Sequence, residues 1–439
     1  MQPREPAQSA HPQTADAARA RLASDLRERS RALSRPVQDA FALVPRHVFV
    51  PEVAPAAAYQ DEAFVIKCGP DGLPVSSSSQ PAMMAIMLDQ LGLRPGHRVL
   101  EIGTGSGYNA AVMATVVGPS GKVVSIDIDA ELVARARASL AAAGYDDVRV
   151  LCGDGGFGDP DDAPFDRIIV TAGAWDIAPA WLDQLTADGL LVLPLSVRGI
   201  QLSVALRPAE GTCWRSTSAW RCGFVRMLGA FAGPESVLKL AEPDVLIAQA
   251  ADGSAMDPAA LRAALAGPPA AELVLAQPCE LAEFADLDVW LTLSAAGLDR
   301  VTVFAAGSWF PLPLTLPAGF LVSHAAAADR LGAAALLPAV RGDPDSQPDK
   351  PVSGAVIRGF GPGGKSLVGY LGALADRWAE LGWPDVRQLQ LTVRPATGQP
   401  ATGRSGDRAD AGPARPGEPL VLQRPSVSIE VGWSPSLPG

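Results

Sequence analysis

A glycine-rich turn between two strand-like segments is the feature that most constrains the fold of this chain. Val99–Ile102 is apolar and strand-like, glycines occupy positions 103, 105 and 107, and a helix-like stretch over Tyr108–Val117 follows. A second apolar strand then ends in Asp127. Glycine permits a tight turn and lets a ligand lie against bare amide groups at a helix N-terminus. Because an acidic residue at the end of the next strand can accept hydrogen bonds from a ribose, this order predicts a nucleotide-type site in an α/β sheet.

Strands and helices alternate through the first half of the chain. The predicted strands are Val99–Ile102, Val123–Ile126, Val148–Leu151, Arg167–Thr171 and Leu190–Leu195, and the predicted helices between them are Tyr108–Val117, Ala130–Ala143 and Trp181–Leu185. Regular alternation favours a doubly wound, mostly parallel sheet, whose ligands bind at the carboxyl ends of the strands.

The length of 439 residues suits two or three domains. We expect a disordered N-terminus over 1–15, the α/β domain over 16–222 and an additional α+β domain over 223–394. A flexible linker rich in Gly, Pro, Ala and Arg is predicted over 395–419, followed by a closing strand and tail over 420–439.

Composition excludes several classes of protein. The net charge of −11 disfavours nucleic-acid binding, which depends on Lys and Arg. The five cysteines are scattered without a CxxC pair, so neither a zinc site nor a disulfide framework is indicated. The sequence contains no apolar run of membrane-spanning length and no apolar N-terminal stretch typical of a signal peptide. We therefore expect a cytoplasmic protein without membrane or metal partners.

The glycine spacing after Glu101, G-T-G-S-G, resembles S-adenosylmethionine (SAM)-dependent methyltransferases rather than the G-x-G-x-x-G of dinucleotide-binding enzymes. Further blocks accompany it in a fixed order: VPRHVFVPE (Val44–Glu52), AYQDEAFVIK (Ala58–Lys67), VSSSSQP (Val75–Pro81), CGDG (Cys152–Gly155) and APFDRIIVTAGAWDIAPAWLDQL (Ala163–Leu185). Together they resemble the protein-L-isoaspartate (D-aspartate) O-methyltransferase family over roughly Val37–Leu206. The resemblance implies a Rossmann-like SAM-dependent methyltransferase sheet and a peptide or protein substrate that carries aspartyl or isoaspartyl residues.

The same resemblance implies the site residues. Those expected to bind SAM are Glu101, Gly103, Thr104, Gly105, Gly107, Asp127, Ile128, Asp154 and Gly155, with Asp127 at the ribose and Asp154 at the adenine amine. Ser79, with its neighbour Ser78, matches the serine block associated with catalysis. The less favoured alternatives are a helix cap or turn residue for Asp154 and, for Ser79, a loop or capping serine before the helix that starts near Pro81.

A carboxylate acceptor explains why few catalytic groups are visible. It is already ionised at pH 7, so methyl transfer needs positioning and exclusion of water rather than a general base. A short polar loop, Ser76–Ser79, suits that task. His47 and His97 are interpreted as loop and turn residues rather than as bases.

Two departures from the family pattern point to an altered substrate. The segment Lys67–Val75 is longer than the family pattern, and Trp175 with Asp176 replaces a more usual Ala-Pro. With the extra domain, these features resemble a subgroup associated with ribosomal peptide natural products (lanthipeptide-type, FxLD systems), in which methylation leads to a succinimide. A general isoaspartyl repair enzyme and an inactive SAM-binding peptide scaffold are the alternatives.

One further motif, GFGPGGKS over Gly359–Ser366, fits the P-loop pattern G-x-x-x-x-G-K-[ST]. ATP binding there is disfavoured, because the sequence shows no strand that ends in a magnesium-binding Asp. A glycine-rich entry to a helix is the preferred interpretation.

Overall fold

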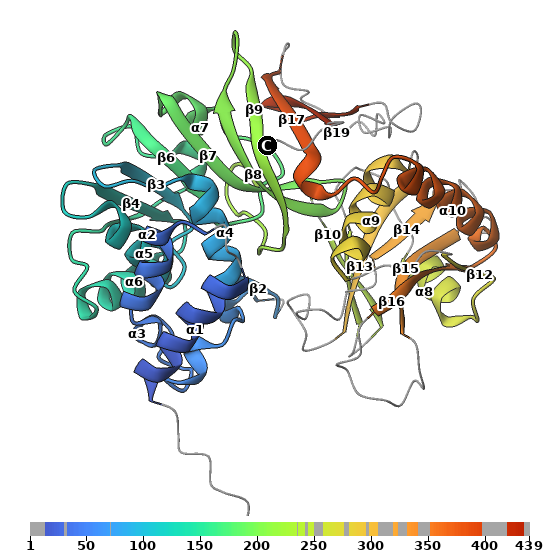
Figure 1. Cartoon of the computed structure of the whole chain (residues 1–439), viewed down its shortest axis with the longest axis horizontal. Helices are drawn as coiled ribbons and strands as arrows, with labels where there is room; N and C mark the ends of the chain where they lie inside the picture. The colour runs from blue at the N-terminus through green and yellow to red at the C-terminus, as the bar shows by residue number, and fades with distance from the viewer. Residues whose placement is uncertain are drawn as a thin grey trace, which may run out of the picture.

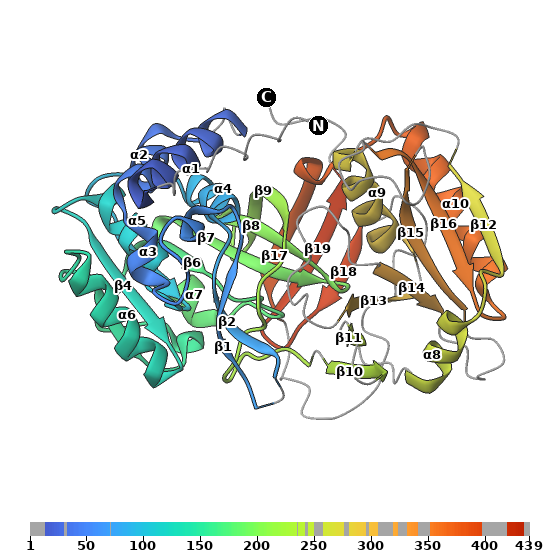
Figure 2. The ribbon, with the colours of Figure 1, turned by 90° about the horizontal axis from the view of Figure 1, so that it is seen from below.

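The structure, a computed structural model, describes residues 14–29, 33–70, 72–234, 236–241, 245–249, 258–275, 281–295, 298–305, 319–323, 332–340, 352–396 and 419–433. A ten-stranded and a seven-stranded sheet lie side by side, with a small hairpin at the edge of the first (Figures 1 and 2). Within these ranges, no helix is both long and apolar enough to cross a bilayer.

The first half of the ten-stranded sheet is parallel, as the sequence predicts. Its strands, in spatial order, are β5 (Arg149–Cys152), β4 (Lys122–Asp127), β3 (Arg98–Ile102), β6 (Phe165–Val170) and β7 (Leu185–Val197). The helices of this half are α1 (Ala15–Arg29), α2 (Arg35–Leu43), α3 (Arg46–Phe49), α4 (Pro81–Leu91), α5 (Tyr108–Val117), α6 (Ala130–Ala142) and α7 (Pro179–Asp183). Two short 3₁₀ turns, η1 (Ala57–Tyr59) and η2 (Gly155–Phe157), complete it.

The second half of this sheet is antiparallel, which the mostly parallel prediction missed. It runs outward from β7 through β8 (Ile200–Pro208), β9 (Trp214–Cys222), β17 (Leu389–Pro395), β19 (Val427–Trp433) and β18 (Leu420–Gln423). The pairing of β9 with β17 joins segments more than 170 residues apart, so no local sequence pattern announces it.

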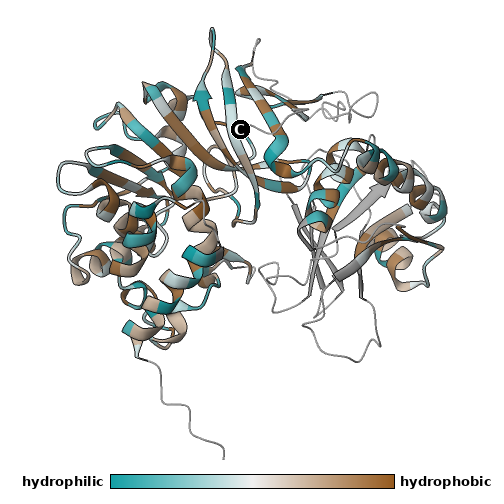
Figure 3. Cartoon of the chain, viewed as in Figure 1, coloured by the Kyte–Doolittle hydropathy of each residue, from teal (hydrophilic) through white to brown (hydrophobic). Residues whose placement is uncertain are grey.

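The parallel strands are buried on both faces, and hydrophobic residues run along β6 to β8 (Figure 3). One face packs against α1, α2, α4, α5 and α6 around residues such as Phe41, Val112 and Val133. The opposite face packs against Trp181 of α7 and continues without a break beneath β17 to β19. The C-terminal strands therefore share one hydrophobic core with this second face.

The second sheet is antiparallel throughout, with β10 and β12 as its two edge strands. Its order is β10 (Ser236–Ala241), β11 (Val245–Gln249), β13 (Leu298–Ala305), β14 (Gly319–Ser323), β15 (Gly332–Val340), β16 (Val352–Phe360) and β12 (Ala271–Val274). Helices α8 (Pro258–Ala266), α9 (Leu281–Ser294) and α10 (Gly364–Glu380) accompany it, whereas the 3₁₀ turn η4 (Val386–Gln388) packs against the first sheet through Val386. Val289 and Leu293 of α9 pack into the core of the first sheet, whereas Trp290 packs into that of the second.

The P-loop-like motif is a packed strand-to-helix connection. Both neighbours of β16 are antiparallel to it, whereas a P-loop belongs to a strand–loop–helix unit that holds phosphates and magnesium. A Cβ on Gly332 would lie 2.7 Å from the backbone of Gly363, so neighbouring backbone fills this loop. This packing agrees with the preferred interpretation of a glycine-rich helix entry.

The sheet order differs from the predicted division of the chain. Strands β17, β18 and β19 were expected in or after the second domain, yet they extend the sheet of the first. The predicted disordered residues 1–13, most of the predicted linker (397–418) and the tail 434–439 lie outside the described residues.

Candidate functional site

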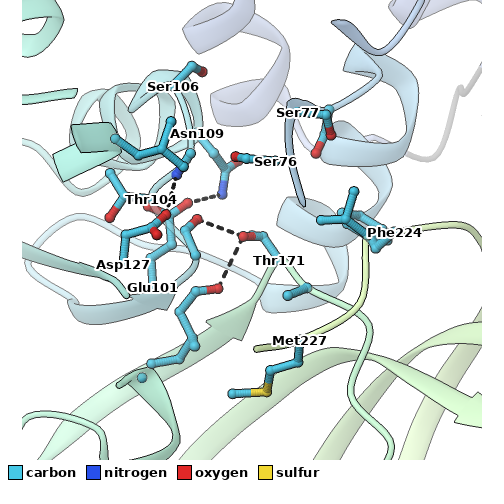
Figure 4. A pocket seen from close by; sticks show the side chains of 18 of the residues that line it. Ser76, Ser77, Glu101, Thr104, Ser106, Asn109, Asp127, Thr171, Phe224 and Met227 are labelled. Carbon is cyan, nitrogen blue, oxygen red and sulfur yellow. Dashed lines mark hydrogen bonds between the residues drawn. The ribbon is translucent and has the colours of Figure 1, made fainter. Parts of the chain in front are cut away.

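A single cavity gathers most of the predicted site residues at the carboxyl ends of β3, β4 and β6 (Figure 4). Of the predicted set, Ser78, Ser79, Glu101, Gly103, Thr104, Gly105, Asp127, Ile128 and Gly155 line it. Gly107 and Asp154 are not among the lining residues.

The glycine turn after β3 has the backbone conformation that the sequence predicts. Gly103, Gly105 and Gly107 all have positive φ, at 100°, 52° and 86°. A Cβ on Gly103 would lie 2.5 Å from the Thr171 hydroxyl. Gly107 packs against Ala136 of α6 and begins α5, so its role in this structure is the tight turn itself.

Asp127 lies at the end of β4, beside this turn. Its carboxylate accepts hydrogen bonds from the amides of Gly105 (2.9 Å) and Asp129 (3.0 Å). Burial raises the pKa of the Asp127 carboxyl, which is only 9% exposed. Ile128 is 43% exposed and presents an apolar surface to the cavity next to this carboxylate.

Glu101 is a fully buried acid beneath the cavity. It accepts hydrogen bonds from the Asn109 amide (2.8 Å) and the Ser125 hydroxyl (2.5 Å), and Ser125 in turn bonds Thr104. Burial raises the pKa of Glu101 to about 7 despite these two donors. A Glu101 carboxyl at the bottom of the site therefore changes charge near neutral pH.

This raised pKa predicts a pH-dependent stability. The stabilisation from Glu101 is complete below its unfolded pKa of 4.5 and is lost as pH rises through about 7, because the unfolded chain then binds fewer protons than the folded one. The loss is steepest at about 1.4 kcal/mol per pH unit. Urea unfolding of the wild type and Glu101→Gln between pH 5 and 8 measures it, and parallel pH profiles of the two proteins would contradict it.

The four serines before α4 form an edge of the cavity. Ser76 to Ser78 lie on a strand rather than on the predicted loop, and Ser79 directly follows that strand. We refer to Ser76–Ser79 together as the serine strand. β2 (Pro74–Ser78) pairs with β1 (Phe64–Cys68), and Ser76 to Ser79 all line the cavity. A Cβ on Gly105 would lie 3.3 Å from the Ser77 carbonyl, so this hairpin packs directly over the glycine turn. At the hairpin's far end, Lys67 pairs with Asp129 (2.7 Å) and Glu131 (2.6 Å) at the start of α6.

Arg46 holds the serine strand in place, and the sequence reasoning assigned it no role. Its guanidinium is fully buried and donates to the carbonyls of Ser78 (3.4 Å) and Ser79 (2.9 Å). Three more carbonyls, of Ala58, Gln60 and Glu62, accept from the same group. Burial lowers the pKa of Arg46 to about 10, so it remains charged at neutral pH. The sequence signal that could have pointed to this role is the arginine within the family-like block Val44–Glu52.

The opposite side of the cavity is residues 224–228, which lie at the start of the predicted second domain and were also missed. In Figure 4, Phe224 lies just below Ser77 and Met227 lies below Thr171. Gly173 fixes this segment through backbone bonds to Val225 (2.8 Å) and Met227 (3.0 Å). The residues come from a turn after β9, and only the folded sheet brings them to the glycine turn.

Asp154 caps the 3₁₀ turn η2, and its predicted contact with the adenine amine stays a prediction. One carboxylate oxygen accepts from the Gly156 amide (2.9 Å) and the other from the Ala230 amide (2.7 Å). Gly155 does line the cavity, and its carbonyl accepts from the Trp181 indole (2.9 Å).

The two histidines lie outside the residues that line the cavity, as interpreted. His47 bonds the Tyr59 hydroxyl (2.8 Å), and His97 accepts from the Arg94 amide (3.2 Å). Among the described residues, no group of three or more His, Cys, Asp or Glu side chains is arranged to hold a metal ion.

Three polar atoms of the cavity lining lack a partner within the protein. Ser78 Oγ, Tyr108 Oη and Asn109 Oδ1 are buried polar atoms at its lining without a hydrogen-bond partner. Such atoms are costly unless a ligand or water satisfies them. With the acidic Asp127 beside a helix N-terminus and the exposed Ile128, they fit a ligand that joins an amino acid to a nucleoside.

Comparison with known proteins agrees with this site. The family profile described as protein-L-isoaspartate(D-aspartate) O-methyltransferase (PCMT) matches residues 17–229. Protein-L-isoaspartate O-methyltransferase 2 of Archaeoglobus fulgidus is 49% identical over 41% of this chain and 79% of its own length. The corresponding enzyme of Methanopyrus kandleri is 42% identical over 50% of this chain and 96% of its own length.

Two solved structures are also similar. A protein-L-isoaspartate O-methyltransferase covers 85% of this chain and 96% of its own at 23% identity and a TM-score of 0.47. A Plasmodium falciparum enzyme of that description, in complex with S-adenosyl-L-homocysteine, covers 48% of this chain and 98% of its own at 21% identity and a TM-score of 0.41. On the profile and the sequence relatives, the chain belongs to the protein-L-isoaspartate O-methyltransferase family and is a SAM-dependent methyltransferase.

Proposed function

We propose that this protein methylates the carboxylate of isoaspartyl residues in peptides or proteins. The observation that carries the proposal is the meeting of the serine strand, Ser76–Ser79, with the glycine turn and Asp127 in one cavity. When bound, SAM supplies a methyl group on a positively charged sulfur. The serine strand then lies where an acceptor carboxylate would approach.

The residues of the cavity suit an acceptor that arrives already ionised. Among the described lining residues, hydroxyl, apolar and acidic side chains predominate, and Arg226 is the one basic residue. The serine hydroxyls and backbone amides can orient a carboxylate, and the covering hairpin and residues 224–228 exclude water. Positioning and exclusion of water of this kind are what methyl transfer to a carboxylate needs.

Asp127→Ala is expected to weaken SAM binding by about 1–3 kcal/mol, because a buried carboxylate that bonds ribose is lost. Isothermal titration calorimetry with SAM measures the change. Asp147, exposed and outside the cavity lining, supplies the matched control Asp147→Ala. Equal SAM affinities of Asp127→Ala and the control would remove Asp127 from the site.

Ser79→Ala is expected to lower turnover on the order of tenfold to hundredfold while changing SAM affinity little, since a positioned donor acts mainly on the reacting group. Steady-state kinetics with calorimetry separates the two effects. Equal losses of turnover and SAM affinity would contradict a positioning role. Ser78→Ala, which removes the hydroxyl without a partner, serves as the comparison.

Labelled SAM and a matched pair of peptides test the function itself. The two peptides share one sequence, with isoaspartate in the first and aspartate in the second. Transfer to the isoaspartyl peptide alone supports a repair methyltransferase. Transfer to neither, despite SAM binding, would refute a general repair methyltransferase and leave the inactive scaffold and the dedicated enzyme described next.

The second candidate is a dedicated precursor peptide in which an ordinary aspartate is methylated and then closes to a succinimide. Two features favour it. The lengthened segment Lys67–Val75 joins the two strands of the hairpin over the cavity, and about 200 residues follow the part that matches the family. A ribosomal precursor peptide encoded beside the gene, with its rings installed, is the third substrate to offer. Methylation of that peptide alone, with later loss of methanol, would identify a tailoring enzyme.

A further inference from the structure

The pair Trp175 and Asp176, interpreted from sequence as part of an altered substrate edge, lies outside the cavity lining. Asp176 is buried and accepts a hydrogen bond from the amide of Ser426 (2.9 Å), in the turn between β18 and β19. The Arg424 guanidinium, in the same turn, lies 4.3 Å from the centre of the Trp175 ring. Both residues therefore contact the C-terminal hairpin, more than 240 residues further along the chain.

Trp175 also contacts the far end of the segment that closes the cavity. We call residues 224–233 the wall segment. A Cβ on Gly233 would lie 2.6 Å from Trp175 Cβ and 3.0 Å from its Cγ, so the backbone of Gly233 packs directly on this side chain. One tryptophan thus contacts both the wall segment and the C-terminal hairpin.

The residues just before Trp175 complete the connection to the cavity. Thr171 donates to the carbonyl of Gly103 (2.7 Å) in the glycine turn. Gly173 bonds Val225 and Met227 of the wall segment, and Ala174 bonds Pro194 (2.8 Å) and Ser196 (2.7 Å) of β7. Residues 171–176 therefore contact the glycine turn, the wall segment and the C-terminal hairpin in succession.

We propose that the C-terminal hairpin β18–β19 positions the wall of the SAM cavity through Trp175, so that cofactor binding depends on strands outside the part of the chain that matches the family. Trp175 acts as a positioning residue, because it touches neither the cavity nor the reacting atoms. The inference rests on the proposed function in one respect, namely that the ligand of the cavity is SAM. The position of the wall segment itself can be measured without any ligand.

The test compares full-length variants in two measurements. Trp175→Ala removes the ring that packs on Arg424 and on Gly233 and leaves only the Cβ against Gly233, and Arg424→Met removes the guanidinium from the ring while keeping a long side chain. Arg394→Met is the matched control: Arg394 pairs with Glu430 (3.0 Å) on the surface of β17 and β19 and lies outside the cavity lining. Trp175→Phe is the conservative variant, since Trp175 Nε1 has no partner to lose.

Hydrogen exchange without cofactor reports the wall segment, and calorimetry reports SAM affinity. We expect faster exchange at the amides of Met227 and Ala230, and SAM binding weakened by about fivefold to tenfold, in Trp175→Ala and Arg424→Met. Arg394→Met and Trp175→Phe should match the wild type in both. The proposal would be overturned if Trp175→Ala and Arg424→Met had the same hydrogen-exchange rates and SAM affinity as the wild type, even if their melting temperatures were lower. Faster exchange in a protein whose wild type binds no SAM would support the positioning role and refute the cofactor assignment.

Discussion

Arg46→Met should lower the free energy of unfolding by more than about 3 kcal/mol, because each buried carbonyl left without a donor costs about 1–3 kcal/mol. Five carbonyl oxygens from two segments converge on this one guanidinium. Arg46→Lys should restore only part of the stability, since an ammonium cannot reach five acceptors spread around a planar group. Chemical denaturation followed by circular dichroism measures both variants.

In Arg46→Lys, we expect the loss of turnover to be more pronounced than the loss of stability. Ser78 and Ser79 lose their anchor, so turnover should fall more than SAM affinity at a temperature where the variant is folded. Arg135→Met is the matched control, because Arg135 forms a surface pair with Glu52 (2.6 Å), and such pairs contribute about 0–1 kcal/mol. A loss of stability in Arg46→Met no greater than in Arg135→Met would show that water replaces the guanidinium without cost.

Truncation after Gly223 should abolish SAM binding. The predicted boundary after residue 222 would leave the cofactor site within the first domain, but residues 224–228 form one side of the cavity. The fragment also loses β17 to β19, which cover the edge of β9 and share a continuous hydrophobic core with β7 and β8. We expect a fragment that self-associates, measured by light scattering, and that gives no heat with SAM.

A second fragment that ends at Pro234 separates the loss of the wall residues from the loss of β17 to β19. It keeps the wall residues that line the cavity but still lacks β17 to β19, so weak SAM binding together with self-association is expected. A soluble fragment 1–223 that binds SAM as the full chain does would contradict the structure at both points. Equal and measurable SAM binding by the two fragments would show that the wall residues contribute little to the cofactor site.

The fold of the first half could be predicted because its determinants are local. Apolar runs of strand length, the positive-φ glycines before Tyr108 and the acid at the end of β4 lie within thirty residues of one another. The carboxyl ends of parallel strands meet at one edge of a sheet, so the glycine turn, Asp127 and Ile128 had to come together there. The position of the serine strand followed from the family resemblance rather than from any local rule.

The sequence by itself determined the methyltransferase core and most of the residues that line its cavity. Only the tertiary structure decided which later segments complete that core. Antiparallel pairing of β9 with β17 depends on side chains and backbone groups distant in sequence, for example the Ser216 hydroxyl that accepts from the Leu391 amide (2.8 Å). Neither partner carries a local signal for the other. For the same reason the sequence could not show that Asp154 contacts the Ala230 amide, or that Trp175 and Asp176 contact the C-terminal hairpin.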